Sequence, residues 1–157
     1  KIFKYYIDTI SISIMIFGSI ENIKSHSDKY QEILLLLQQL TSCPPIPIER
    51  YLNIIYNLHE NHEIYLYFYN NKLVGMGTIL IERKIIHNGS NVAHIEDIVV
   101  DKDYRNMGIA KQIINFLKAK AKKKMCYKII LNCTEELVPF YEKNSFKKSA
   151  IQMNMKI

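Results

Sequence analysis

The chain has 157 residues, of which 48% are hydrophobic and 23% are charged, a composition typical of globular proteins that excludes an intrinsically disordered chain. Its length fits a single domain over residues 1–157, large enough to bury a continuous hydrophobic core. A net charge of +6 is compatible with a nucleic-acid surface, a polyanionic small-molecule partner or a general enrichment in Lys, Ile and Asn, so charge alone does not choose between them.

The N-terminal third of the chain predicts one strand followed by two helices. Residues 10–17 alternate with period two and are too short to cross a bilayer, so we predict a β-strand there and no membrane partner. Ser25 or Ser27 can cap a helix that ends before the Pro44-Pro45 pair. A second helix is predicted over residues 48–58. The expected apolar face of the first helix consists of Tyr30, Ile33, Leu34, Leu37 and Leu40.

Cysteine and histidine usage argues against a disulfide framework and against a metal site. Cys43, Cys126 and Cys133 are odd in number and contain no CxxC pair, which favours a reducing compartment, and we expect a cytoplasmic protein. His59 and His62 have a spacing that metal ligands sometimes show, but no further histidine or cysteine lies nearby. We therefore expect no metal cofactor.

The middle of the chain predicts three consecutive antiparallel strands. Residues 63–69 and 72–81 form a hairpin around Asn70-Asn71, because asparagine tolerates the positive φ angles of a tight turn. Residues 92–100 form the next strand. They are followed by a loop, an amphipathic helix over about residues 108–124 and a buried strand over residues 127–133, an order that predicts a parallel crossover.

The C-terminal segment predicts a short helix and a closing strand. Thr134 can cap a helix that ends at Glu142, and residues 146–157 are predicted to form the last strand. The densest lysine cluster, over residues 118–124, ends the preceding amphipathic helix, where cations complement the helix dipole. Because no aromatic platform accompanies it, we expect no nucleic-acid partner.

The loop between the third strand and the long helix has the pattern of a phosphate-binding loop. Arg105, Gly108 and Ala110 stand at the spacing R-x-x-G-x-A, between an apolar strand and an amphipathic helix. Backbone N–H groups and the helix dipole converge on an anion at such a point, and Gly108 permits close approach of the backbone. Arg105 and Lys111 add positive charge. An ordinary strand-to-helix turn remains the alternative.

The order of elements and this loop resemble the GNAT superfamily of N-acetyltransferases, an α/β fold with a mixed, mostly antiparallel sheet flanked by helices. Within it, the chain is similar to the glucosamine 6-phosphate N-acetyltransferase family of the hexosamine pathway, which makes UDP-N-acetylglucosamine precursors. The first 60 residues match weakly. The blocks that carry the narrower resemblance are Glu82 to His87, His94 to Val100, Cys126 to Cys133 and Val138 to Lys143.

The resemblance implies direct acetyl transfer from acetyl-CoA to the 2-amino group of D-glucosamine 6-phosphate. The fourth strand would bulge, and its backbone N–H groups would polarise the thioester carbonyl. Tyr141 would stand beside the sulfur as the acid for the leaving thiolate. Glu96 and Asp97 would bind the amino sugar, one of them accepting a proton through water. The implied acetyl-CoA contacts are Ile98, Val99, Val100, Arg105, Asn106, Met107, Gly108, Ile109, Ala110, Lys111 and Tyr141.

The resemblance also implies a cationic pocket for the sugar phosphate and a homodimer whose pockets are completed across the interface. Besides Glu96 and Asp97, the substrate residues would be Thr41, Lys84, His87, Tyr127, Lys128 and Lys156. Three positions depart from the family. Lys156 replaces an arginine, so a single ammonium charge stands where a guanidinium could bind the phosphate through two hydrogen bonds. Asn132 stands where an aspartate is frequent, and Leu137 stands where an asparagine contacts coenzyme A.

Two alternatives stay open at the level of sequence. The chain could be a GNAT enzyme for another amine, such as a protein N-terminus, a lysine or a polyamine, since the phosphate-type loop is common to the whole superfamily. It could also be a noncatalytic domain that binds acetyl-CoA and has a regulatory role, because Asn132 and Leu137 could mark lost activity. The cationic pocket residues favour an acceptor that carries phosphate.

Overall fold

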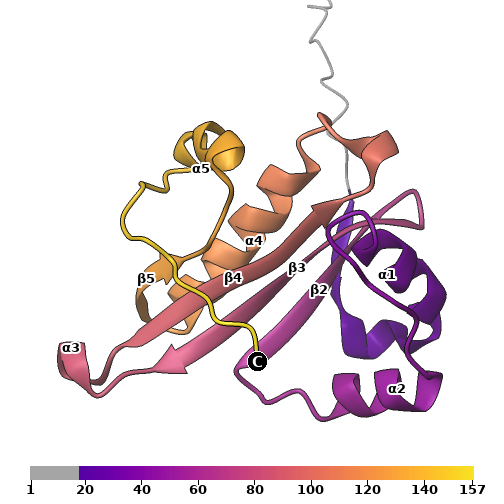
Figure 1. The fold of residues 1–157 in the computed structure, drawn as a ribbon, viewed down its shortest axis with the longest axis horizontal. Helices are drawn as coiled ribbons and strands as arrows, with labels where there is room; N and C mark the ends of the chain where they lie inside the picture. The colour runs from indigo at the N-terminus through magenta and orange to yellow at the C-terminus, as the bar shows by residue number, and fades with distance from the viewer. Residues whose placement is uncertain (1–17) are drawn as a thin grey trace, which may run out of the picture.

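The computed structural model describes residues 18–157, so the strand predicted for residues 10–17 lies outside the described residues. The chain forms a five-stranded sheet in the order β1-β2-β3-β4-β5 (Figure 1). The first four strands pair antiparallel, and β5 pairs parallel with β4. This confirms the predicted mixed, mostly antiparallel sheet. The strands are β1 (Ser19–Asn22), β2 (His62–Tyr69), β3 (Lys72–Arg83), β4 (Asn91–Val100) and β5 (Cys126–Ile130).

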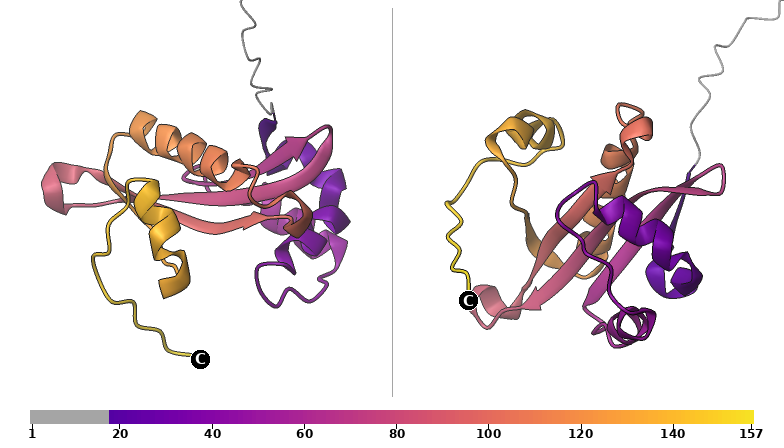
Figure 2. Two further views of the ribbon diagram at one scale, coloured as in Figure 1. Left: turned by 90° about the horizontal axis from the view of Figure 1, so that it is seen from above. Right: turned by 45° about the vertical axis from the view of Figure 1, so that its right-hand side comes forward.

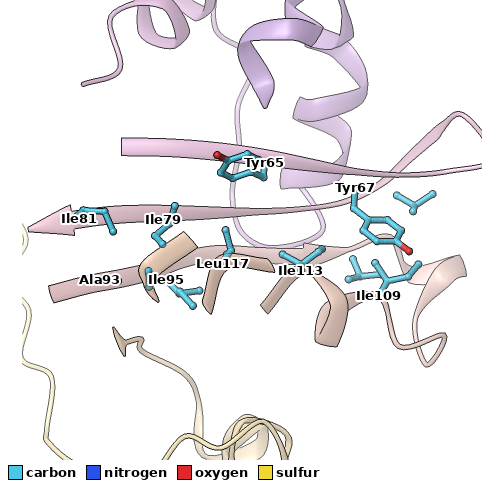
Figure 3. Close-up of a cluster of buried hydrophobic side chains, with 12 residues drawn as sticks. Tyr65, Tyr67, Ile79, Ile81, Ala93, Ile95, Ile109, Ile113 and Leu117 are labelled. Atoms are coloured by element: carbon cyan, nitrogen blue, oxygen red, sulfur yellow. The ribbon is translucent and has the colours of Figure 1, made fainter. Parts of the chain in front are cut away.

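Helices cover the two faces of the sheet unequally. The long helix α4 (Ile109–Lys123) lies along one face, and the helices α1 (Tyr30–Leu37) and α2 (Ile48–Tyr56) lie on the other, at one end of the strands (Figure 2). The larger hydrophobic core lies between α4 and the sheet, where Ile109, Ile113 and Leu117 pack against alternate residues of β2, β3 and β4 (Figure 3). Because α1 and α2 cover only part of their face, a stretch of β3 and β4 stays uncovered there.

The hairpin and the crossover agree with the sequence prediction. Asn70 and Asn71 have φ angles of +49° and +60°, and they connect β2 to β3. The crossover from β4 through α4 returns to β5 in the parallel direction, as predicted. A short turn, α3 (Ile86–Gly89), joins β3 to β4 where a loop is predicted.

The predicted cap of the first helix is wrong. Ser25 and Ser27 lie inside a 3-10 helix, η1 (Ile23–Lys29), and α1 begins at Tyr30 with no side-chain cap bond at Lys29. The apolar face of this helix also differs from the predicted one, because α1 ends at Leu37 and Leu40 lies in the following turn, where it is 41% exposed. Leu36, which the pattern omits, is buried instead.

Three expectations for the C-terminal part are wrong. β5 ends at Ile130 and is largely exposed rather than buried, because it is the edge strand of the sheet. Thr134 precedes a 3-10 turn, η3 (Glu135–Leu137), without a side-chain cap bond, and α5 (Val138–Lys143) follows. Residues 146–157 form no strand, because a strand needs a neighbour to hydrogen-bond and the tail pairs with no strand of residues 18–157. The alternate apolar residues of the tail, Ile151, Met153, Met155 and Ile157, are 82–117% exposed.

No helix among residues 18–157 is long and apolar enough to cross a membrane. Over the same residues, no group of three or more His, Cys, Asp and Glu side chains is arranged to hold a metal ion.

Candidate active site

The middle of β4 contains a β-bulge. Thr78 of β3 pairs with Glu96, whereas Met76 pairs with Val99, so that Asp97 and Ile98 both lie opposite Gly77. Asp97 takes a φ angle of +52°. A Cβ atom on Gly77 would lie 2.5 Å from Cδ1 of Ile98. Glycine at position 77 therefore leaves the space into which the bulge turns the Ile98 side chain. The bulge that the resemblance implies for the fourth strand is present.

β4 and β5 separate just before this bulge. The ladder between them runs only over Asn91 to His94 on β4 and Cys126 to Ile130 on β5. Beyond this ladder, the part of β4 from Ile95 to Val100 has no β5 partner within residues 18–157. Backbone N–H groups on that edge of β4 are therefore free to donate hydrogen bonds to a ligand inserted between the strands.

The loop that follows β4 has the backbone form of an anion site. Asn106 and Gly108 have φ angles of +63° and +77°, and Gly108 is the N-cap residue of α4. No atom lies within 4 Å of where a Cβ of Gly108 would be, so open space faces the loop. The first N–H groups of α4 have no intrahelical acceptor and carry the positive end of a 15-residue helix. Arg105 and Lys111 are exposed beside them.

Tyr141 on α5 is the buried phenol of the site. It is 9% exposed and packs edge-on against Phe140 and Phe146, with ring centroids 5.1 and 5.8 Å apart. Burial raises the pKa of Tyr141 above its ordinary value, and the negative charge of Glu96 adds to this effect. The phenol therefore stays protonated at neutral pH and is available as a donor. Cys133, which our sequence reasoning did not place in the site, is exposed close to this ring.

The two acidic residues of β4 take different positions. Glu96 is half-buried and Asp97 is exposed on the bulge. Ile79 pairs with Ile95 on the face that packs against α4. Met76 pairs with Val99 on the face that packs against α1 and α2. The pair of Thr78 and Glu96 lies between these two pairs. Because neighbouring pairs alternate between the faces, Glu96 points away from α4, to the face that α1 and α2 only partly cover.

Most of the predicted phosphate-binding residues gather at the other end of β4. Lys84 forms an ion pair with Glu82, whose other oxygen lies 3.0 Å from Nε2 of His94. The rings of His87 and Tyr127 have centroids 4.4 Å apart, and Nζ of Lys128 lies 5.5 Å from the Tyr127 centroid. Glu82 and His94 are additional members of this cluster. No local signal in the sequence indicates them, because the cross-strand register, Glu82 with Val92 and Leu80 with His94, brings the two side chains together.

Thr41 and Lys156 are not part of this cluster. Thr41 is exposed after α1, two positions from Gln39, whose Oε1 accepts a hydrogen bond of 2.8 Å from the backbone N–H of Lys102. It therefore lies near the loop end of β4. Lys156 is exposed in the C-terminal tail. The structure thus divides the predicted substrate residues between two ends of the sheet.

Comparisons with known proteins agree with this geometry. The model of the acetyltransferase (GNAT) family matches residues 31–146. The chain is 34% identical to glucosamine 6-phosphate N-acetyltransferase of Arabidopsis thaliana over 133 residues, covering 82% of this chain and 89% of that protein. It is 42% identical to glucosamine 6-phosphate N-acetyltransferase 1 of Dictyostelium discoideum over 85 residues, a match that spans about half of each protein, 54%.

A solved structure shows the same fold. The crystal structure of the Arabidopsis thaliana glucosamine-6-phosphate N-acetyltransferase superposes with a TM-score of 0.80 at 29% identity, covering 89% of this chain and 98% of that one. The similarity includes both the sheet and the helices around it.

Proposed function

The chain belongs to the acetyltransferase (GNAT) family, and from that premise we propose that it transfers the acetyl group of acetyl-CoA to the 2-amino group of D-glucosamine 6-phosphate. The product would be N-acetylglucosamine 6-phosphate, which leads to UDP-N-acetylglucosamine. One observation supports the proposal most: β4 has two different ends. At one end the strand is bulged and separates from β5, which suits acetyl-CoA, and at the other end a cationic cluster suits a phosphate monoester. The relatives named above carry this activity in their names.

The residues at the splayed end fit acetyl-CoA, which supplies an acyl group activated as a thioester. The loop from Arg105 to Lys111 and the N-terminus of α4 would hold the pyrophosphate through backbone N–H groups. The backbone of Ile98, Val99 and Val100 would donate to the acyl oxygen, where negative charge develops during transfer. The bulge serves this role because it turns donors out of the β3 ladder.

The two side-chain roles in proton transfer follow from burial and charge. Tyr141 would donate its phenolic proton to the departing sulfur, since its raised pKa keeps it protonated. Glu96 and Asp97 would receive the acceptor's ammonium group, hold its hydroxyls and take the released proton through water. Transfer is direct, with no acyl-enzyme intermediate.

We also propose that the active form is a homodimer, in which the two parts of each acceptor site come from different chains. Within one chain, Lys128 pairs with Val92, four residue steps from Glu96 on β4, so at about 3.3 Å per step their backbones lie about 13 Å apart. A second copy would present its Lys84, His87, Tyr127 and Lys128 to the Glu96 end. Thr41 and Lys156 would complete the pocket from the loop end and the tail.

The exposed C-terminal tail supports this assembly. Its apolar residues alternate from Ile151 to Ile157 as in a strand with one buried face, yet they have no neighbour within residues 18–157. Such an unpaired strand pattern favours a protein partner. The whole chain would form one acetyltransferase domain. Its three thiols are free, which is consistent with a reducing compartment such as the cytoplasm.

The proposal is tested by measuring coenzyme A release with three amines at equal concentration. Glucosamine 6-phosphate should be much preferred over unphosphorylated glucosamine and over a peptide amine, because the phosphate meets the cationic cluster. Equal rates with the two sugars would refute the specificity. Release with the peptide amine alone would indicate another GNAT specificity, and acetyl-CoA binding without any release would indicate a noncatalytic domain.

A further inference from the structure

Thr78 carries a buried hydroxyl group that the fold does not use. The residue is 3% exposed, and its Oγ1 has no hydrogen-bond partner among residues 18–157. A buried hydroxyl without a partner destabilises a protein, because it has lost its bonds to water. Only one other side-chain atom of the described residues is in the same condition, the hydroxyl of Tyr51. A hydrophobic residue would serve packing better at position 78.

The position of Thr78 relates this hydroxyl to the candidate active site. Thr78 pairs directly with Glu96, at the last regular pair before the bulge. Directly opposed residues of antiparallel strands point to the same face, with Cβ atoms about 4.5–5.5 Å apart. The Thr78 hydroxyl and the Glu96 carboxylate are therefore separated by a side-chain rotation or by one water molecule.

We propose that Thr78 is a positioning residue for Glu96, and that its hydroxyl donates a hydrogen bond to the Glu96 carboxylate when the acceptor amine is bound. This inference rests on the proposed function, in which Glu96 receives the amine. A hydrogen bond from a neutral donor fixes one carboxylate oxygen and leaves the other free for the substrate. Thr78 does not touch the substrate.

The other polar groups around Glu96 are less suited to this task. His94 lies on the same face of β4 but is engaged with Glu82 at 3.0 Å. Asp97 carries the same charge as Glu96 and is exposed on the bulge. From α5, Tyr141 faces Glu96 and Cys133, and its proton is assigned to the leaving sulfur. Thr78 is the donor that β3 supplies, and it contributes no charge of its own.

The test compares Thr78→Val, which keeps the shape and removes the hydroxyl, with Thr78→Ser, which keeps the hydroxyl. For Thr78→Val we expect a melting temperature at least equal to that of the wild type, since an unpartnered hydroxyl is lost. We also expect kcat/KM for the amine to fall about tenfold or more, as for the loss of a hydrogen bond to a charged group. The KM for acetyl-CoA should not change, and Thr78→Ser should recover most of the activity.

A matched control and a double variant make the test specific. Tyr51→Phe removes the other unpartnered hydroxyl, from α2, where Tyr51 packs in the core beneath that helix, and should leave all kinetic constants unchanged. In a Glu96→Gln background, Thr78→Val should cause much less further loss, because the two residues act as a unit. Equal losses in both backgrounds, or wild-type kinetics for Thr78→Val, would overturn the inference. Wild-type protein that does not acetylate glucosamine 6-phosphate would instead refute the proposed function.

Discussion

The two ends of β4 differ in how much of a site a single chain can build. At the splayed end, the bulge, the α4 N-terminus and Tyr141 converge from β4, α4 and α5 of one chain. At the paired end, β4 is held between β3 and β5, and Lys84, His87, Tyr127 and Lys128 lie on its exposed rim without a carboxylate pair for the amine. The residues of the proposed cofactor half therefore belong to one end of one chain, whereas those of the proposed acceptor half are divided between the two ends.

This difference follows from the type of ligand that each end must bind. Backbone N–H groups and a helix dipole come from local structure, so one loop and one bulge can provide them. A sugar phosphate requires an acidic and a cationic group at opposite ends of a small molecule. Along β4, Lys128 and Glu96 are four residue steps, about 13 Å, apart in the same chain, and in the proposed homodimer a second copy brings such groups together.

The largest expected effect concerns the splayed end. Tyr141→Phe removes the proton donor and should lower kcat about 100-fold, in the range of lost acid catalysis. The affinity for acetyl-CoA should change little, because the ring and its packing remain. Steady-state kinetics and calorimetric titration measure the two quantities, with the exposed Tyr56→Phe variant as control. Because burial raises the pKa of Tyr141, kcat should also show no alkaline decline below about pH 10. An unchanged kcat in Tyr141→Phe would remove this residue from the acid role.

The second effect tests whether the two ends belong to different chains. Tyr141→Phe and Lys128→Ala subunits are each expected to give weakly active homodimers. When they are mixed, half of the dimers are mixed, and one of their two sites receives both wild-type residues. Activity should therefore recover to about a quarter of the wild-type value. Separately tagged subunits allow the mixed dimer to be purified, and its activity should then be about half of the wild-type value. No recovery in a confirmed mixed dimer would show that each site is built by one chain.

A smaller effect is expected from the glycine under the bulge. Gly77→Ala places a Cβ 2.5 Å from Cδ1 of Ile98 and 2.9 Å from Cγ2 of Ile113, which should cost about 1–3 kcal/mol of stability. The melting temperature should fall by several degrees, and kcat should fall as the Ile98 backbone shifts. Shortening the nearest neighbour by Ile98→Val should recover part of the stability. A Gly77→Ala variant as stable and active as the wild type would show that the bulge tolerates a side chain.

The smallest effect is expected from the ion pair between Lys120 of α4 and Glu63 of β2, which lies outside both ends of β4. Burial alone would raise the pKa of Glu63, but hydrogen bonds from Lys120 and Tyr65 outweigh it and lower the pKa. The charged carboxylate then stabilises the fold above its unfolded pKa of about 4.3, and this contribution is lost as the pH falls through the lower folded value. Glu63→Gln should cost less than about 1 kcal/mol at pH 7, since the pair is partly exposed. Urea unfolding should show the difference at pH 7 and not at pH 2, with Glu60→Gln unchanged at both.

Local signals in the sequence were sufficient for the hairpin, the crossover and the position of the loop before α4. The hairpin at Asn70-Asn71, the crossover through α4 and the loop at Gly108 depend on periodicity and on glycine or asparagine at positive φ, which act over a few residues. The start of α1 was mispredicted, because tertiary packing placed a 3-10 helix where serine caps were available.

Only the tertiary structure decided how far apart the predicted site residues lie. Lys84, Glu96 and Tyr127 belong to three short blocks of the sequence, but their separation depends on cross-strand register and on the point where β5 leaves β4. Register is set by pairing between distant segments, so no window of sequence contains it. The C-terminal tail shows the same limit, because its alternating pattern is local but pairing with a neighbouring strand is not. The position of the unpartnered Thr78 hydroxyl opposite Glu96 likewise follows only from strand pairing.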